Sequence, residues 1–172
     1  MKPYVLGKSI FFREVVIADA EFIIELRTDL ERSKHLSVTS DNIEKQRNFI
    51  SCYLNSEIDY YFIISDWNKK SLGTIRIYDI QGDSFCWGSW IISKDAPSSA
   101  AIESALLIYD FAFFSLHYQK SHFDVRKENQ RVVEFHKRFG ASIINEDNLN
   151  FYFQYDLDTY FSARQKYRRF LP

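Results

Sequence analysis

The chain has 172 residues, 46% of them hydrophobic, which is enough to bury a sizeable core in one domain spanning residues 1–172. Its net charge of −1 provides no positive field to gather nucleic acid or an anionic membrane, so we expect neither as a partner. The two cysteines, Cys52 and Cys86, form neither a disulfide framework nor a metal-type pair, which indicates a reducing, cytoplasmic compartment.

Hydrophobic periodicity predicts strands and helices in alternation along the chain. The first strand is followed by two amphipathic helices, and Asp19 can cap the first of them. Three β-type runs come next, joined by turns short enough for antiparallel pairing. The predicted ranges of these elements are 10–16 (strand), 19–29 and 42–55 (helices), and 60–65, 72–80 and 84–92 (strands).

The most apolar segment, residues 100–116, carries its apolar side chains at helical spacing and predicts a long helix. Glu103 and Asp110 interrupt it, which argues against a membrane span. Gly140 is expected to end the next helix in a left-handed conformation. The remaining predicted ranges are 121–126 (strand), 130–139 (helix), and 141–145 and 150–157 (strands). Residues 159–172 place four cations among aromatic side chains, which favours a terminal amphipathic turn over a phosphate-binding patch.

The predicted order is β-α-α-β-β-β-α-β-α-β-β, and "VRKENQRVVEFHKRFG" at residues 125–140 reads V-x-x-x-N…F-G. From Ile10 to Leu157, the chain resembles the GNAT superfamily of acyl-CoA-dependent N-acetyltransferases. Its opening "FFREVVIADAEFIIELRTD" is similar to the branch of ribosomal-protein N-terminal and amino-sugar acetyltransferases, and "GTIRIYDI" and "FCWGSWII" to enzymes of surface-polysaccharide biosynthesis. The resemblance implies an α/β (α+β) GNAT fold with a mixed central sheet of about seven strands, splayed between the fourth and fifth.

The same resemblance implies that acetyl-CoA binds where the fourth strand, 84–92, parts from the fifth. Pantetheine would pair with the backbone of the fourth strand as if it were another strand, which places Trp90, Ile91 and Ile92 beside it. Such pairing uses main-chain groups and requires no particular side chain. Trp87 and Trp90 are therefore also compatible with being core rings.

GNAT proteins usually carry Q/R-x-x-G-x-G/A before the long helix, where this chain has "APSSAA" at residues 96–101. Small residues still let phosphates approach the N–H groups of a helix start, and serine hydroxyls can donate to them. Ala96 replaces a likely phosphate partner and Glu103 adds a negative charge, so an ordinary serine-capped helix is the alternative. The residues implied by the resemblance as pyrophosphate ligands are Ser98, Ser99, Ala100 and Ala101.

His136 occupies the position where many relatives place a tyrosine beside the acyl-CoA sulfur. The resemblance implies that it protonates the departing thiolate, and a histidine can supply a proton near neutral pH. The alternative is a buried histidine that fills the apolar stripe of its helix. Asn129, at the start of that helix, is either a ligand of pantetheine and acetyl groups or a plain N-cap.

The incoming amine must be neutral to attack, so a base is expected near the splayed strands. Asp124 is our candidate, and it shares a strand face with His122 because alternate residues of a strand face the same side. Asp79 and Asp83 lie between neighbouring strands, and each of these four residues is also compatible with a structural role.

The resemblance thus implies an enzyme that moves acetyl from acetyl-CoA directly to a primary amine, through an oxyanion held by N–H groups of the fourth strand and without a metal. A nucleotide-linked amino sugar is the preferred acceptor. A protein or peptide N-terminus as acceptor, and a non-catalytic GNAT-like binding module, stay open, as does a homodimer.

Overall fold

The computed structural model describes residues 4–29 and 42–172. Its strands are β1 (Val5–Leu6), β2 (Ile10–Glu14), β3 (Tyr60–Asp66), β4 (Ser71–Gln81), β5 (Ser84–Ile92), β6 (Lys120–Arg126), β7 (Ser142–Glu146) and β8 (Asn150–Asp156). They form one eight-stranded sheet in the order β1-β2-β3-β4-β5-β6-β8-β7. All neighbours are antiparallel except β5 and β6, which are parallel. The mixed sheet is therefore confirmed, with one strand more than predicted.

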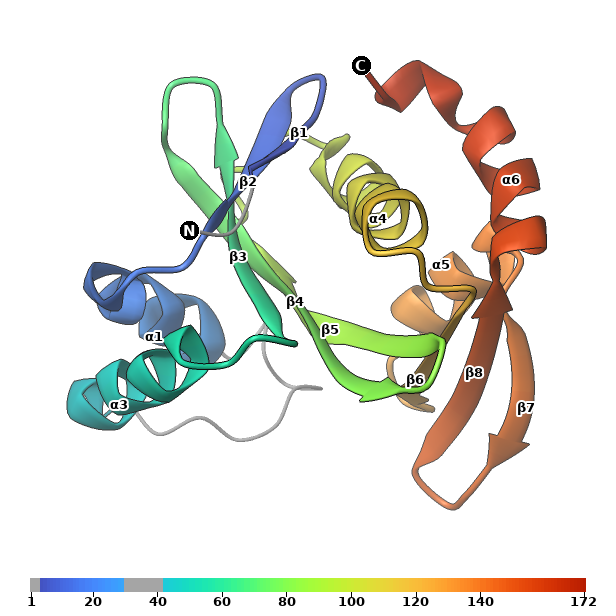
Figure 1. Ribbon diagram of the computed structural model, residues 1–172, viewed down its shortest axis with the longest axis horizontal. Coiled ribbons are helices and arrows are strands. Elements are labelled where there is room, and N and C mark those ends of the chain that lie inside the picture. The colour runs from blue at the N-terminus through green and yellow to red at the C-terminus, as the bar shows by residue number, and fades with distance from the viewer. Residues whose placement is uncertain (1–3, 30–41) are drawn as a thin grey trace.

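Helices cover both faces of this sheet. They are α1 (Ala20–Thr28), α3 (Ile43–Leu54), α4 (Ala100–Asp110), α5 (Gln130–Phe139) and α6 (Leu157–Lys166), with short turns of other helix types at Ile17–Asp19, Phe111–Ser115 and Arg168–Phe170. Figure 1 shows α1 and α3 on one side of β2–β4 and α4 on the other. Two separate apolar clusters result, a small one under α1 and α3 and a large, ring-rich one under α4, α5 and α6.

Every predicted helix and strand is present in the predicted order, and α5 has the predicted bounds. Gly140 ends α5 with φ 98, and its N–H bonds to the carbonyl of His136, as a left-handed cap requires. The splay between the fourth and fifth predicted strands, which are β5 and β6, is also confirmed, because they pair at only two positions.

Three local expectations were wrong. Asp19 does not cap α1, because its carboxylate accepts hydrogen bonds from Arg13 at 2.7 and 2.8 Å and from the N–H of Val16. The long helix ends as an α-helix at Asp110 and continues as a π-helical turn over Phe111–Ser115. The expected terminal turn begins with a ten-residue helix, α6, capped by an Asp156 side chain that accepts from the N–H of Thr159.

Glu103 joins the first turn of α4 to the start of β2. It lies in the first turn of α4, and only 1% of it is exposed. Its carboxylate accepts hydrogen bonds from the N–H of Ser9 at 2.8 Å, from the N–H of Ile10 at 3.2 Å and from the Ser9 hydroxyl. These bonds fix the start of β2 against α4, and they compensate for the removal of the carboxylate from water.

We predict that Glu103→Ala lowers the free energy of unfolding by about 3 kcal/mol, because the half-buried Ser9 N–H and the buried Ile10 N–H then lose their acceptor. Glu103→Gln keeps one oxygen for both N–H groups and should cost only about 1 kcal/mol. Urea unfolding measures both values. The matched control is Glu134→Ala, on the exposed face of α5, which should change stability by no more than about 0.5 kcal/mol. Equal losses for the two Glu103 variants would contradict this account.

Candidate active site

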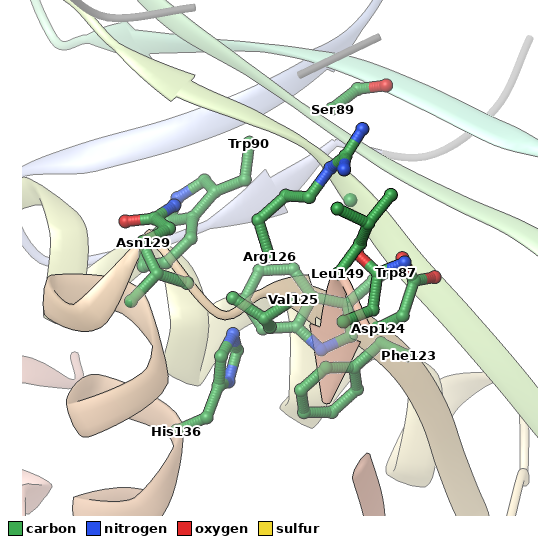
Figure 2. A pocket seen from close by; sticks show the side chains of 13 residues that line it. Trp87, Ser89, Trp90, Phe123, Asp124, Val125, Arg126, Asn129, His136 and Leu149 are labelled. Carbon is green, nitrogen blue, oxygen red and sulfur yellow. The ribbon is translucent and has the colours of Figure 1, made fainter. Parts of the chain in front are cut away.

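The candidate site is a cleft of about 370 Å³ at the point where β5 and β6 separate. The two strands pair only at Ser84–Lys120 and Phe85–Ser121. Beyond Phe85, β5 has no ladder with β6, so the edge of β5 that faces β6 is left for another partner. The cleft lies between these two strands, the start of α5 and the turn between β7 and β8 (Figure 2).

Strand alternation gives the cleft two chemically different sides. Phe123 and Val125 of β6 are buried in the large core, so they face α4 and α5. Asp124 and Arg126 are exposed and face the opposite way. We call these the helix side and the open side. The helix side is apolar and aromatic, whereas the open side carries charged groups.

A β-bulge shapes the β5 wall. Ser89 and Trp90 together lie opposite Ile75 of β4 alone, and Ser89 has φ 47. Thr74 donates from its hydroxyl to the carbonyl of Ser89 at 2.7 Å, which holds this left-handed residue in place. A bulge leaves one residue outside the ladder, so backbone groups here can point to a ligand in the cleft.

The predicted residues of the fourth strand differ in their relation to the cleft. Trp90 lines it, is half-buried, and donates from its indole N–H to the Ser104 hydroxyl of α4 at 3.0 Å. Trp87 also lines it and is a core ring, since only 4% of it is exposed. Ile91 and Ile92 do not line the cleft and instead pair with β4.

His136 lies in the helix-side wall among rings, with 4% of its surface exposed. Its ring centroid is 4.3 Å from that of Phe123 and 5.5 Å from that of Trp87. Burial lowers the pKa of His136 from 6.5 to about 3, so the ring is neutral near pH 7. The apolar surroundings therefore exclude the charged form in the free site, and the role of His136 as a proton donor to the thiolate stays a prediction.

Asn129 also lines the cleft. Its carbonyl accepts from the N–H groups of Val132 and Val133, at 3.1 and 3.0 Å, but its side chain makes no capping hydrogen bond. The plain side-chain cap is therefore not observed, and the amide is available to a ligand. Figure 2 shows Asn129, Trp90 and His136 along the same wall of the cleft.

Asp124 lines the open side and forms no ion pair with any residue that the structure describes. His122, on the same face, has a different role, because its Nδ1 lies 2.7 Å from the Ser84 hydroxyl and its Nε2 lies 3.1 Å from a carboxylate oxygen of Asp79. These contacts join the hairpin of β4 and β5 to β6 where the strands begin to separate. Asp83 accepts backbone bonds from Gln119 and Lys120 through its carbonyl and does not line the cleft.

The loop before α4 lies outside this cleft. Ser99 is the N-cap residue of α4, and its side chain makes no capping bond. Within the described part of the chain, the N–H groups of Ala101 and Ile102 have no hydrogen-bond partner. An α-helix begins here with donors that an anion can use. The position of Glu103 in the sequence suggested that its charge would repel an anion at this helix start. Its carboxylate is instead directed to β2, where it accepts hydrogen bonds.

Among the residues that line the cleft, sequence reasoning missed Arg126, Leu149 and Asn150. Leu149 lies in the turn between β7 and β8, and Asn150 is the first residue of β8, far along the chain from β6. Only the pairing of β6 with β8, which aligns Arg126 with Asn150, brings them to the cleft. Alternation along β6 was the one available signal, since it puts Arg126 on the same face as Asp124.

In residues 4–29 and 42–172, no group of three or more His, Cys, Asp or Glu side chains is placed to hold a metal ion. In the same ranges, no helix combines the length and the apolarity that crossing a membrane requires.

The chain belongs to the GNAT family of acetyltransferases, since residues 9–142 match the family model described as an acetyltransferase (GNAT) domain. It is therefore an acyltransferase. A comparison with curated protein sequences found no match.

Solved structures agree with this assignment. The chain is similar to the apo form of FdhC, described as a nucleotide-linked sugar GNAT, with 36% identity over 100% of both chains and a TM-score of 0.91. A GCN5-related N-acetyltransferase from Brucella melitensis has 15% identity, covering 100% of this chain and 86% of that one, with a TM-score of 0.82. Mutant forms of the spermidine/spermine N-acetyltransferase SpeG from Vibrio cholerae have 15% identity, covering 90% and 97%, with a TM-score of 0.74. The last two show the fold alone.

We predict that the burial of His136 makes stability depend on pH. The folded state keeps the ring neutral down to about pH 3, whereas the unfolded chain takes up a proton near pH 6.5. The stability that this residue contributes is therefore complete above pH 6.5 and is lost as the pH falls towards 3. Between pH 7.5 and 5.0, the free energy of unfolding should fall by about 2 kcal/mol more in the native protein than in His136→Phe. Urea unfolding at both pH values measures this difference, and equal slopes would show that His136 is not held neutral.

Proposed function

We propose that this enzyme transfers acetyl from acetyl-CoA to the amino group of a nucleotide-linked amino sugar in surface-polysaccharide biosynthesis, with residues 1–172 acting as one domain. The observation that carries the acceptor class is the 36% identity to the nucleotide-linked sugar GNAT. It extends over 100% of both chains and so includes the strands and the turn that form the cleft. The single sheet, which contains every strand of residues 4–29 and 42–172, supports the one-domain part of the proposal.

Acetyl-CoA fits the helix side of the cleft. The edge of β5 beyond Phe85 is not paired with β6, so its backbone groups can form hydrogen bonds with the amides of pantetheine. Those amides need such partners in an apolar channel. The N–H groups of Ala101 and Ile102, with the hydroxyls of Ser98 and Ser99, can hold the pyrophosphate at the start of α4. The Asn129 amide supplies a further polar contact inside the cleft.

The amine fits the open side, where Asp124 is the proposed base. Asp124 accepts a proton from the ammonium group, directly or through water, and the neutral amine attacks the carbonyl carbon of the thioester. The C–N bond forms as the carbonyl oxygen becomes an anion, which N–H groups at the Ser89–Trp90 bulge can stabilise. The carbonyl then re-forms as the C–S bond breaks, the nitrogen releases its second proton to water, and the sulfur leaves as a thiolate that accepts a hydrogen bond from the His136 ring.

Thiol release from acetyl-CoA, measured with a panel of acceptors, tests the proposal. The panel contains nucleotide-linked amino sugars, peptides with a free N-terminus and spermidine. We expect kcat/KM for the best nucleotide-linked sugar to exceed the values for the other classes by about 100-fold or more, a difference typical of a site built for polar groups of its substrate. A preference for peptides would replace the proposal by N-terminal acetylation. Folded protein that fails to bind acetyl-CoA in calorimetry would point to a non-catalytic binding module.

We predict that His136→Phe lowers kcat by about 10²-fold or more, because the ring remains but the donor to the thiolate is lost. The affinity for acetyl-CoA should change much less, since His136 contacts only the reacting end of the cofactor. His136→Tyr should recover part of the rate, because a phenol can donate from the same helix face. Thermal unfolding of each variant is the control for folding. A kcat within about threefold of the native value in folded His136→Phe would assign the histidine to packing alone.

A further inference from the structure

We propose that Arg126 binds the phosphate of the acceptor, and that Asp124 and Arg126 together select acceptors whose amine and phosphate lie about one hexose ring apart. This inference rests on the proposed function and adds the residue that distinguishes a nucleotide-linked amino sugar from other amines.

The spacing of the two residues comes from β6 itself. Asp124 and Arg126 are two positions apart on one strand, so their Cα atoms are about 6.6 Å apart and their side chains face the same side. Both line the cleft. Figure 2 shows the long Arg126 side chain extending from β6 over the cleft towards Ser89 of β5. A single pyranose ring, with its amine at one position and its phosphate at the anomeric carbon, spans a comparable distance.

Arg126 is available for an anion. Three other arginines that pack near the sheet each form an ion pair with an aspartate: Arg13–Asp19 (2.7 Å), Arg76–Asp59 (3.0 Å) and Arg164–Asp110 (2.8 Å). Arg126 forms no ion pair with any residue in the described ranges, although Asp124 is its neighbour on the same face. Two opposite charges that lie close and stay unpaired can each take the complementary group of a ligand, and a guanidinium matches a phosphate with two parallel hydrogen bonds.

The turn between β7 and β8 keeps the surroundings of Arg126 fixed. The Asp147 carboxylate accepts from the N–H groups of Leu149 and Asn150 at 2.8 and 2.7 Å. The Tyr152 hydroxyl and these two N–H groups hold the pKa of Asp147 at about 2, so the turn keeps its form over a wide pH range. Leu149 also accepts from the N–H of Lys127, the residue after Arg126, at 2.8 Å. The binding groups therefore stand on a rigid frame before the acceptor arrives.

Leu149 gives this frame an apolar face. It lines the cleft, yet 55% of it is exposed, and the turn holds it there. A pyranose ring has an apolar C–H face that can cover such a side chain while its amine and phosphate reach Asp124 and Arg126. A polyamine lacks the ring and carries positive charge at both ends, which Arg126 repels. The cleft thus combines a cation, an anion and an exposed apolar side chain, which are the groups that match the phosphate, the amine and the ring of a nucleotide-linked amino sugar.

The test compares the native enzyme, Arg126→Gln and Arg126→Lys with two acceptors: a nucleotide-linked amino sugar and the same amino sugar without the nucleotide. Arg126→Gln should lower kcat/KM for the nucleotide-linked acceptor by about 10- to 100-fold, the usual effect of losing hydrogen bonds between charged groups. The free sugar has no phosphate, so its kcat/KM should fall by a much smaller factor, and the ratio of the two values should fall. Arg126→Lys should recover part of the loss, because it keeps the charge without the paired geometry.

The matched control is Arg168→Gln, which removes an exposed arginine that does not line the cleft and should leave the ratio unchanged. A second measurement is independent of catalysis and uses enzyme whose cofactor site is saturated with CoA. A nucleoside diphosphate should bind the native enzyme at least tenfold more tightly than Arg126→Gln. This factor should be close to the fall in kcat/KM for the nucleotide-linked acceptor.

An unchanged ratio in Arg126→Gln, with the native enzyme active on the nucleotide-linked sugar, would overturn the role of Arg126 and leave the proposed function intact. A native enzyme that acetylates neither sugar would overturn both.

Discussion

The short parallel contact between β5 and β6 is the constraint on which the site depends. Backbone pairing there covers only two positions, and side chains strengthen it. The Ser121 hydroxyl donates to the carbonyl of Phe85, the last paired residue of β5, at 3.0 Å. His122 contacts both the Ser84 hydroxyl and the Asp79 carboxylate. These contacts hold the two halves of the sheet together at one end, so the strands can separate beyond it and leave a cleft with an unpaired backbone edge.

Separation of the strands also divides the chemistry. On the helix side, packing of rings replaces the lost ladder: Phe123 stacks on Phe153 at 5.3 Å and contacts His136, and Trp87 contacts Trp90 at 5.2 Å. That wall has a low dielectric constant and suits a neutral thioester. On the open side, the same strand presents Asp124 and Arg126 to water, which suits a charged acceptor. In the proposed reaction, alternation along β6 would therefore keep the two substrates apart until their reacting atoms meet between the strands.

Local pattern was sufficient for most of the fold. The helix at 130–139 was predicted to the residue because a strong apolar stripe, an Asn at its start and a Gly at its end all agree. Elements with weaker local signals were missed. β1 has two residues, too few for a period, and α6 buries only Tyr160 and Ala163 along its length.

The site was predictable where the signal lies within one element and not where it depends on tertiary contacts. His136, Asn129 and Asp124 were named from the family resemblance and from their positions on a predicted helix and strand, and all three line the cleft. The environment of His136 was not predictable in this way, because its pKa depends on rings contributed by three strands and its own helix. Leu149 reaches the cleft only through the fold of a distant hairpin, and no period in the sequence reports such a contact.

The neutral state of His136 changes how it can take part in the proposed reaction. A charged imidazolium in this apolar wall would be costly before the thioester reacts, and burial removes that charge. The neutral ring still offers an N–H to the sulfur. As the C–S bond breaks, negative charge appears on the sulfur, and a nearby anion favours the protonated form of an imidazole. The interaction between His136 and the sulfur is thus stronger in the transition state than in the ground state, which is the condition for a group to raise kcat.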